Sequence, residues 1–204
     1  MNNGSAVVKL AFGYKCGAGK DTAVLAARRG LESKGFKVYE FRFASALYGL
    51  LHHCQKVCGF PFEKDRAFLH WVGTDWARSK DPQVWVKCFA NKVDTRLAKY
   101  EDPDGGLMPG TRVALLCPDL RFQNEFQYLR QTGWTAVKVD RPLSAEQLAA
   151  RLGTGADGHV SETQLDAKPD WDWDCVIKND GSLAQFDASV QELVEYATAN
   201  TSAA

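Results

Sequence analysis

The stretch GYKCGAGKDT, residues 13–22, decides the fold that this sequence predicts. It follows Val7–Phe12, a short apolar run rich in β-branched residues that is typical of a buried strand. It leads into Thr22–Ser33, where apolar residues recur at helical spacing. A glycine-rich loop between a strand and a helix turns its N–H groups inward at the positive end of the helix dipole. The stretch therefore predicts a phosphate-binding loop, and a glycine turn that merely caps the helix is the weaker interpretation.

Within this loop, Lys20 is placed to reach the β- and γ-phosphates of a nucleoside triphosphate. The strict pattern G-x-x-x-x-G-K-[S/T] would put its first glycine at Tyr14 and its hydroxyl residue at Asp21. Either the loop is one residue longer than in the strict pattern, or Gly17 and Gly19 provide most of the phosphate binding. Asp21 could bind a metal directly or through water, and Thr22 could supply the hydroxyl. The predicted ATP-binding residues are Gly17, Ala18, Gly19, Lys20, Asp21 and Thr22, of which Asp21 and Thr22 are also the predicted metal ligands.

The rest of the chain alternates strands and helices. Residue patterns are typical of strands at Lys37–Phe43, Arg112–Leu116, Thr135–Asp140 and Cys175–Lys178, and of helices at Ser45–Cys58, Glu63–Arg78, Pro82–Lys99, Phe122–Thr132, Ser144–Leu152 and Ser182–Ala199. This alternation predicts an α/β fold of three layers, in which helices cover both faces of a parallel sheet. We expect one domain over residues 1–204, since neither a repeat nor a linker is evident.

Composition places the chain among ordinary globular proteins, with 45% hydrophobic and 25% charged residues, and excludes intrinsic disorder. No apolar run reaches the ~18 residues needed to span a bilayer, so we expect a cytoplasmic protein without a membrane partner. The net charge is zero, but residues 1–100 hold 17 basic and 8 acidic side chains and residues 101–204 the reverse. A basic half is compatible with an anionic ligand or with ordinary solvated charge.

The six cysteines are scattered along the chain, and we expect them to be reduced. The cluster HHCQKVC, residues 52–58, lacks a second pair of ligands at zinc-site spacing. An ordinary helix with core cysteines is therefore favoured over a metal site there.

Further segments follow the phosphate loop in a recognisable order. They are GTDWAR (73–78), DPQVWV (81–86), PDLRFQNE (118–125), VDRP (139–142), HVSE (159–162) and NDG (179–181). With GKDT at 19–22, they make the chain resemble the phage-type deoxynucleoside monophosphate kinases, a branch of the P-loop nucleoside and nucleotide kinases. The resemblance covers residues 7 to about 195. It implies a P-loop NTPase fold with a helical insertion that binds the acceptor nucleotide, at about 44–110, and a lid at about 141–163.

The resemblance also implies a reaction. ATP, with Mg²⁺ as cofactor, would phosphorylate a deoxynucleoside monophosphate to the diphosphate. Such a transfer needs in-line positioning and charge neutralisation more than covalent help. The implied catalytic residues are Lys20, Arg121 and Arg141, and the implied acceptor-binding residues are Lys15, Arg42, Gly73, Thr74, Arg78, Trp85 and Asp119.

Several of these roles have a structural alternative. Trp85 either stacks on the acceptor base or is a core residue at helical spacing. Arg121 either stabilises charge during transfer or pairs with Glu125 one helical turn on. The lysine that the family often has after the second strand is missing from FASALY, residues 43–48, so Arg42 or Lys15 would substitute for it.

Two other functions stay open. Phosphomevalonate kinases of animal type also carry Gly-Lys-Asp, so the acceptor could be another small phosphorylated molecule. A nucleotide-gated nucleic-acid binder would use the basic half and would show strongly salt-dependent binding. The kinase interpretation expects no nucleic-acid partner, and the sequence leaves a homodimer open.

Overall fold

The computed structural model describes residues 4–142 and 163–201. The chain forms two compact units, one of Met1–Glu40 with Tyr100–Ala204 and the other of Phe41–Lys99. The second unit ends before the predicted helical region at 44–110 does, because Tyr100 packs against the sheet of the first unit, with its hydroxyl 2.5 Å from that of Tyr39. The predicted helix at 144–152, and the predicted lid apart from its two ends, lie outside the described residues.

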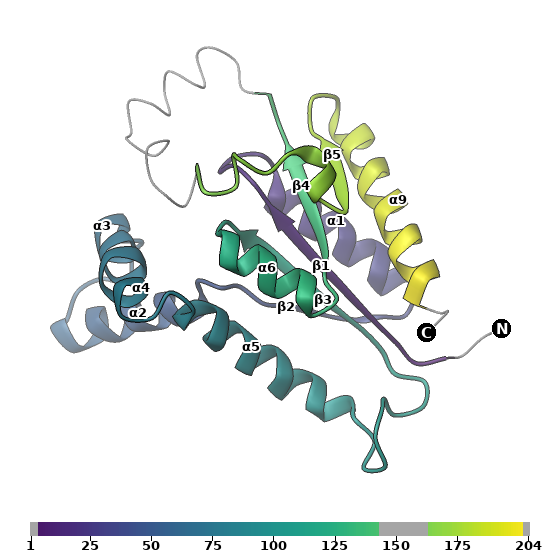
Figure 1. The fold of residues 1–204 in the computed structure, drawn as a ribbon, viewed down its shortest axis with the longest axis horizontal. Helices are drawn as coiled ribbons and strands as arrows, with labels where there is room; N and C mark the ends of the chain where they lie inside the picture. Colours follow the sequence, from purple (N-terminus) through teal and green to yellow (C-terminus); the bar gives the residue numbers. More distant parts are fainter. Residues whose placement is uncertain (1–3, 143–162, 202–204) are drawn as a thin grey trace. The chain divides into compact units, whose positions relative to one another are not determined.

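A five-stranded parallel sheet is the centre of the first unit (Figure 1). Its strands are β1 (Ala6–Gly13), β2 (Lys37–Glu40), β3 (Arg112–Leu120), β4 (Thr135–Asp140) and β5 (Cys175–Lys178), in the order β2-β3-β1-β4-β5. After β1, the chain therefore places β2 and β3 on one side of β1, and then β4 and β5 on the other side. Ligands bind open α/β sheets at the carboxyl ends of the strands where the winding direction reverses. The end of β1 lies at that place.

Helices cover both faces of this sheet. Helices α1 (Lys20–Ser33) and α9 (Leu183–Thr201) pack against each other and share one core with alternate residues of β1, such as Leu10 and Phe12. Helix α6 (Gln123–Gln131) lies on the opposite side of the sheet (Figure 1). On that side Trp173 packs edge-to-face on Phe126 and against Gly13, after the short helix η4 (Asp170–Asp172). The predicted three-layer α/β architecture is confirmed.

The second unit is helical. It contains α2 (Ser45–Cys58), α3 (Arg66–His70), the π-helix η1 (Trp71–Trp76), α4 (Ala77–Lys80) and α5 (Val84–Leu97), and the 3₁₀ helix η2 (Ala98–Tyr100) follows at its end. The continuous α-helix predicted for Glu63–Arg78 is wrong, because it begins only where Asp65 accepts the N–H of Phe68, at 2.9 Å, and its middle widens into a π-helix. Single-turn π segments of this kind are rare and occur frequently at functional sites.

Two strand ends differ from the prediction for identifiable reasons. Strand β2 ends at Glu40, because Phe43 stacks on Phe89 of α5, with ring centroids 4.1 Å apart. Strand β3 continues through Pro118 to Leu120, beyond the predicted end at Leu116. Ala11 pairs with Cys117 but Gly13 pairs with Leu120, so one extra residue of β3 forms a bulge. A bulge accommodates a proline within a ladder and redirects the side chain beside it, here Asp119.

None of the helices in the described parts of the chain is long and apolar enough to cross a membrane.

Candidate functional site

The loop between β1 and α1 turns three residues into the left-handed region: Tyr14 (φ 94°), Gly17 (φ 73°) and Gly19 (φ 102°). Tyr14 is the only non-glycine residue with positive φ in the described chain. It stands where the strict phosphate-loop pattern has its first glycine, and it adopts the backbone that a glycine would adopt. A residue of this size at positive φ costs about 1–3 kcal/mol, and such strain is concentrated at functional sites. The loop therefore differs from the strict pattern in the type of residue at position 14. This gives no support to the interpretation that the loop is one residue longer.

Two cations approach the Tyr14 ring and help to hold it in this conformation. The ammonium of Lys138 lies 4.1 Å from the ring centroid and that of Lys15 lies 5.6 Å away. Lys138 is only 8% exposed, and its ammonium pairs with the Asp170 carboxylate at 2.7 Å. The hydrogen bond from Lys138 lowers the pKa of Asp170. Sequence reasoning missed Lys138, although a lysine inside an otherwise apolar strand is a usable signal, since buried charges are paired.

Lys20 is buried at the base of the loop, with 7% of its surface exposed. Its ammonium donates to the carbonyl of Tyr14, at 3.0 Å, and to the carbonyl of Lys15. Carbonyl oxygens are weaker acceptors for an ammonium than phosphate oxygens are. The side chain is thus already held inside the loop that a triphosphate would enter.

Asn179, the first residue after β5, contacts the loop from outside. Its Nδ2 donates to the carbonyl of Ala18 at 2.8 Å. A Cβ atom added at Gly19 would lie 2.5 Å from the same Nδ2. The left-handed backbone favours glycine at position 19, and any larger residue there would also displace the Asn179 side chain.

Lys15, predicted to bind the acceptor phosphate, forms an ion pair in the structure. Its ammonium lies 2.5 Å and 2.6 Å from the two carboxylate oxygens of Asp166. The side chains are 28% and 43% exposed, so the pair is accessible to solvent and contributes little to stability. A phosphate bound by Lys15 would share its ammonium with the Asp166 carboxylate, or displace it.

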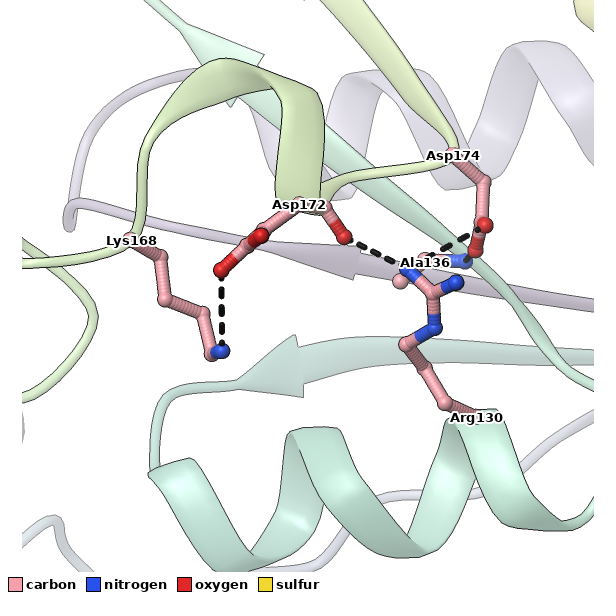
Figure 2. Close-up of polar contacts among 5 residues, drawn as sticks. All are labelled: Arg130, Ala136, Lys168, Asp172 and Asp174. Atoms are coloured by element: carbon pink, nitrogen blue, oxygen red, sulfur yellow. Dashed lines mark hydrogen bonds and ion pairs between the residues drawn. The ribbon is translucent and has the colours of Figure 1, made fainter.

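The segment that carries Asp166 is fastened to α6 and β4 (Figure 2). Arg130 of α6 donates to the carbonyl of Asp172, at 2.5 Å, and lies 3.4 Å from the Asp174 carboxylate. Asp174 also accepts the N–H of Ala136 in β4 at 2.8 Å, and Lys168 lies 3.5 Å from the Asp172 carboxylate. These contacts fix the segment that places Asp166 beside Lys15 and Asp170 beside Lys138.

Asp119 and Arg121 lie at the end of β3, next to the start of the loop in the sheet, and both are partly buried. The Cys117 thiol donates to Asp119 at 3.4 Å, and burial raises the pKa of Cys117 well above its usual value, so the thiol stays protonated. The buried Glu125 carboxylate accepts the backbone N–H groups of Arg121 and Phe122, at 3.0 Å each. Glu125 therefore contacts Arg121 through the backbone and stabilises the start of α6.

Asp21 and Thr22, the predicted metal ligands, are exposed on the first turn of α1. Within residues 4–142 and 163–201 no group of three or more His, Cys, Asp or Glu side chains could hold a metal ion. Arg141 is exposed directly after β4.

Five of the predicted acceptor-binding residues belong to the second unit, and two of them are joined there. Trp85 of α5 is only 5% exposed, and its Nε1 donates to the carbonyl of Gly73 at 2.8 Å. Trp85 packs in a cluster with Leu47, Leu51, Leu69, Val72 and Ala77. This burial favours the core role that the sequence left open beside base stacking.

The other three predicted acceptor-binding residues of the second unit are at least partly exposed. Thr74 is partly exposed on the π-helix and Arg78 is partly exposed on α4. Arg42 is exposed before α2. The GTDWAR segment, residues 73–78, thus combines an unusual backbone with a partly exposed threonine and a partly exposed arginine.

A groove of about 600 Å³ lies between β5 and α9 and is lined by residues that include Val176, Lys178, Gln185 and Tyr196. None of the predicted site residues lines it. The candidate chemistry is therefore assigned to the loop after β1 and not to this groove.

Comparisons with known proteins find distant similarities. No protein-family model matches the chain. The chain is 25% identical over 134 residues to a protein of Acanthamoeba polyphaga mimivirus named "Putative deoxynucleotide monophosphate kinase". That match covers 65% of this chain and 62% of the viral protein, so the chain spans less than two thirds of its relative's length.

Solved structures are similar in fold at low identity. The APS kinase of Mycobacterium tuberculosis, solved with AMPPNP and APS, has a TM-score of 0.49 and 18% identity, over 94% of this chain and 96% of that chain. A protein of Thermus thermophilus has a TM-score of 0.46 and 17% identity, over 95% of this chain and 98% of its own. Because these TM-scores and identities are low, the fold is assigned from this chain's own strand order and from the loop after β1.

Proposed function

We propose that this protein is an ATP-dependent kinase that phosphorylates a deoxynucleoside monophosphate to the diphosphate. The observation that carries the proposal is the loop after β1, with left-handed residues at Tyr14, Gly17 and Gly19 around the buried ammonium of Lys20. A non-glycine residue held at positive φ is costly, and such strain is concentrated at functional sites. The similarity to the viral protein supports the choice of acceptor.

On the donor side, Lys20 would exchange its two carbonyl partners for the β- and γ-phosphate oxygens of ATP. The backbone N–H groups of Gly17, Ala18 and Gly19 would bind the same phosphates at the start of α1. Mg²⁺ usually keeps several waters and takes one or two protein oxygens. The exposed carboxylate of Asp21 and the hydroxyl of Thr22 fit that requirement, and the ion would neutralise charge on the transferred phosphoryl group.

We propose Lys15, Arg42 and Arg78 as the cations that would bind the monophosphate of the acceptor. Arg78 is suited to grip phosphate through two parallel hydrogen bonds. Lys15 would share its ammonium between the acceptor phosphate and the Asp166 carboxylate, or exchange one for the other. Gly73 and Thr74 are proposed to contact the acceptor through backbone and hydroxyl.

At the centre of the reaction, Asp119 is proposed to hold a metal-bound water or the sugar hydroxyl of the acceptor. Arg121 is proposed to stabilise negative charge on the transferred group, since its backbone is fixed by Glu125. Arg141 is proposed to contribute a further cation as part of a lid that excludes water.

A second acceptor class is favoured by one observation. Trp85, the feature that would distinguish a base-binding kinase, is buried and bonded to Gly73, so it offers little surface for stacking. A small phosphorylated acceptor without a base, as in phosphomevalonate kinases, would need no such surface.

A coupled assay of ADP release tests the proposal. ATP and Mg²⁺ are offered with a panel of natural and modified deoxynucleoside monophosphates, ribonucleotides and phosphomevalonate. Lys20→Ala serves as the inactive variant, and Lys34→Ala, which removes a lysine outside the loop, as its matched control. We expect acceptor-dependent ADP release with at least one deoxynucleotide; turnover of phosphomevalonate alone would select the second class, and no turnover with any acceptor would refute both.

A further inference from the structure

Asn179 is held at both its backbone and its side chain. Its N–H donates to the carbonyl of Asp140, at 2.7 Å, where β4 ends. Beside it, the Lys178 ammonium pairs with the Asp140 carboxylate at 2.6 Å. The side-chain amide donates to the carbonyl of Ala18 at 2.8 Å. Asn179 therefore links the ends of β4 and β5 to the last peptide unit of the phosphate loop.

This link determines where the next N–H group points. In a planar trans peptide the N–H of Gly19 points opposite to the C=O of Ala18. Because the Ala18 carbonyl faces Asn179, the Gly19 N–H faces away from it. Within residues 4–142 and 163–201, the Gly19 N–H donates to no protein acceptor. It is an available donor at the positive end of α1.

We infer that Asn179 is a positioning residue for the phosphate loop, which holds the Ala18 carbonyl so that the Gly19 N–H is aimed at a bound phosphate. The inference rests on the proposed function, because it assumes that a nucleoside triphosphate occupies the loop. A donor fixed before the ligand arrives costs no reorganisation on binding. The hydrogen bond to the Ala18 carbonyl requires a side-chain donor at this position, and a carboxylate of the same shape could not supply it.

The test distinguishes the hydrogen-bond donor of the Asn179 side chain from the shape of that side chain. Asn179→Ala removes both, and Asn179→Asp keeps the shape but replaces the donor with a carboxylate that faces the Ala18 carbonyl. Asn200→Ala and Asn200→Asp are matched controls at an exposed asparagine near the end of α9. Affinity for magnesium and a non-hydrolysable ATP analogue is measured by calorimetry, and thermal melting of each variant verifies folding.

We expect Asn179→Ala to bind the analogue roughly tenfold more weakly than the wild type, since losing one neutral hydrogen bond to a buried carbonyl has about that effect. Asn179→Asp is expected to bind at least as weakly at pH 8, and both Asn200 variants like the wild type. In turnover, KM for ATP is expected to rise while KM for the acceptor is unchanged.

Each outcome decides the question. Wild-type affinity in Asn179→Asp would show that only the shape matters and would overturn the inference. If Asn179→Ala does not fold, Asn179→Asp still carries the test. A wild-type protein that binds no triphosphate analogue would overturn the proposed function and this inference together.

Discussion

Replacing Gly19 with alanine tests the loop geometry most sharply, because the chain contains a matched control. Gly19 and Gly35 both have positive φ, 102° and 81°. A Cβ at Gly35 would meet nothing within 4 Å, whereas a Cβ at Gly19 would lie 2.5 Å from Nδ2 of Asn179. Both substitutions place an alanine in the left-handed region, and only one also displaces Asn179.

The expected magnitudes follow from this difference. The left-handed backbone costs an alanine ~1–2 kcal/mol, offset by ~0.4–1 kcal/mol because the unfolded chain loses freedom too. These contributions are similar in the two variants. Gly19→Ala also breaks the hydrogen bond from Asn179 to Ala18, which costs a further ~1–3 kcal/mol if the carbonyl is left unpaired. Gly19→Ala is therefore expected to be less stable than Gly35→Ala by ~1–3 kcal/mol.

Urea unfolding of the two variants measures this difference. A double-mutant cycle with Asn179→Ala identifies its cause, because Gly19→Ala should cost little more than Gly35→Ala once the asparagine is absent. Equal destabilisation of the two glycine variants, or strict additivity in the cycle, would refute the geometry described for the loop.

Three further outcomes are expected. Lys20→Ala should lower kcat by ~100-fold or more, because one fixed donor to the transferring charge is lost, and unchanged turnover would contradict its role. Trp85→Phe should cost ~1–3 kcal/mol of unfolding free energy in urea by leaving the Gly73 carbonyl unpaired; no loss would mean that the bond is absent. The Lys138 ammonium holds the pKa of Asp170 below its usual value of 3.8, so this pair stabilises the fold above that pH. The melting temperature of Asp170→Asn should therefore lie below that of the wild type at pH 7, and the gap should close as the pH falls below 3.8; a gap that persists in acid would contradict this.

Local patterns in the sequence were sufficient for the sheet and the loop. Strand β1 is a run of mostly apolar residues that ends at Gly13, and glycines occupy two of the three left-handed positions in the loop that follows. Strands β4 and β5 and helix α2 have the predicted ends, because apolar spacing and glycine positions mark them. These signals depend on neighbouring residues alone, so one sequence contains them.

The features that the sequence did not reveal depend on contacts between distant residues. Asn179 reaches Ala18 across 161 positions, and Lys15 reaches Asp166 across 151. The burial of Trp85 against Gly73 likewise follows from how α5 packs, which helical spacing does not specify. The bulge that carries β3 past Pro118 arises from the register with β1, which the local pattern of one strand does not specify.

The most direct test of the central claim is a crystal structure of the protein with magnesium and a non-hydrolysable ATP analogue. We predict triphosphate density inside the loop of residues 13–20, with the Lys20 ammonium on phosphate oxygens and no longer on the carbonyls of Tyr14 and Lys15. A loop that stays closed around Lys20 at saturating nucleotide, or nucleotide density elsewhere on the protein, would contradict it.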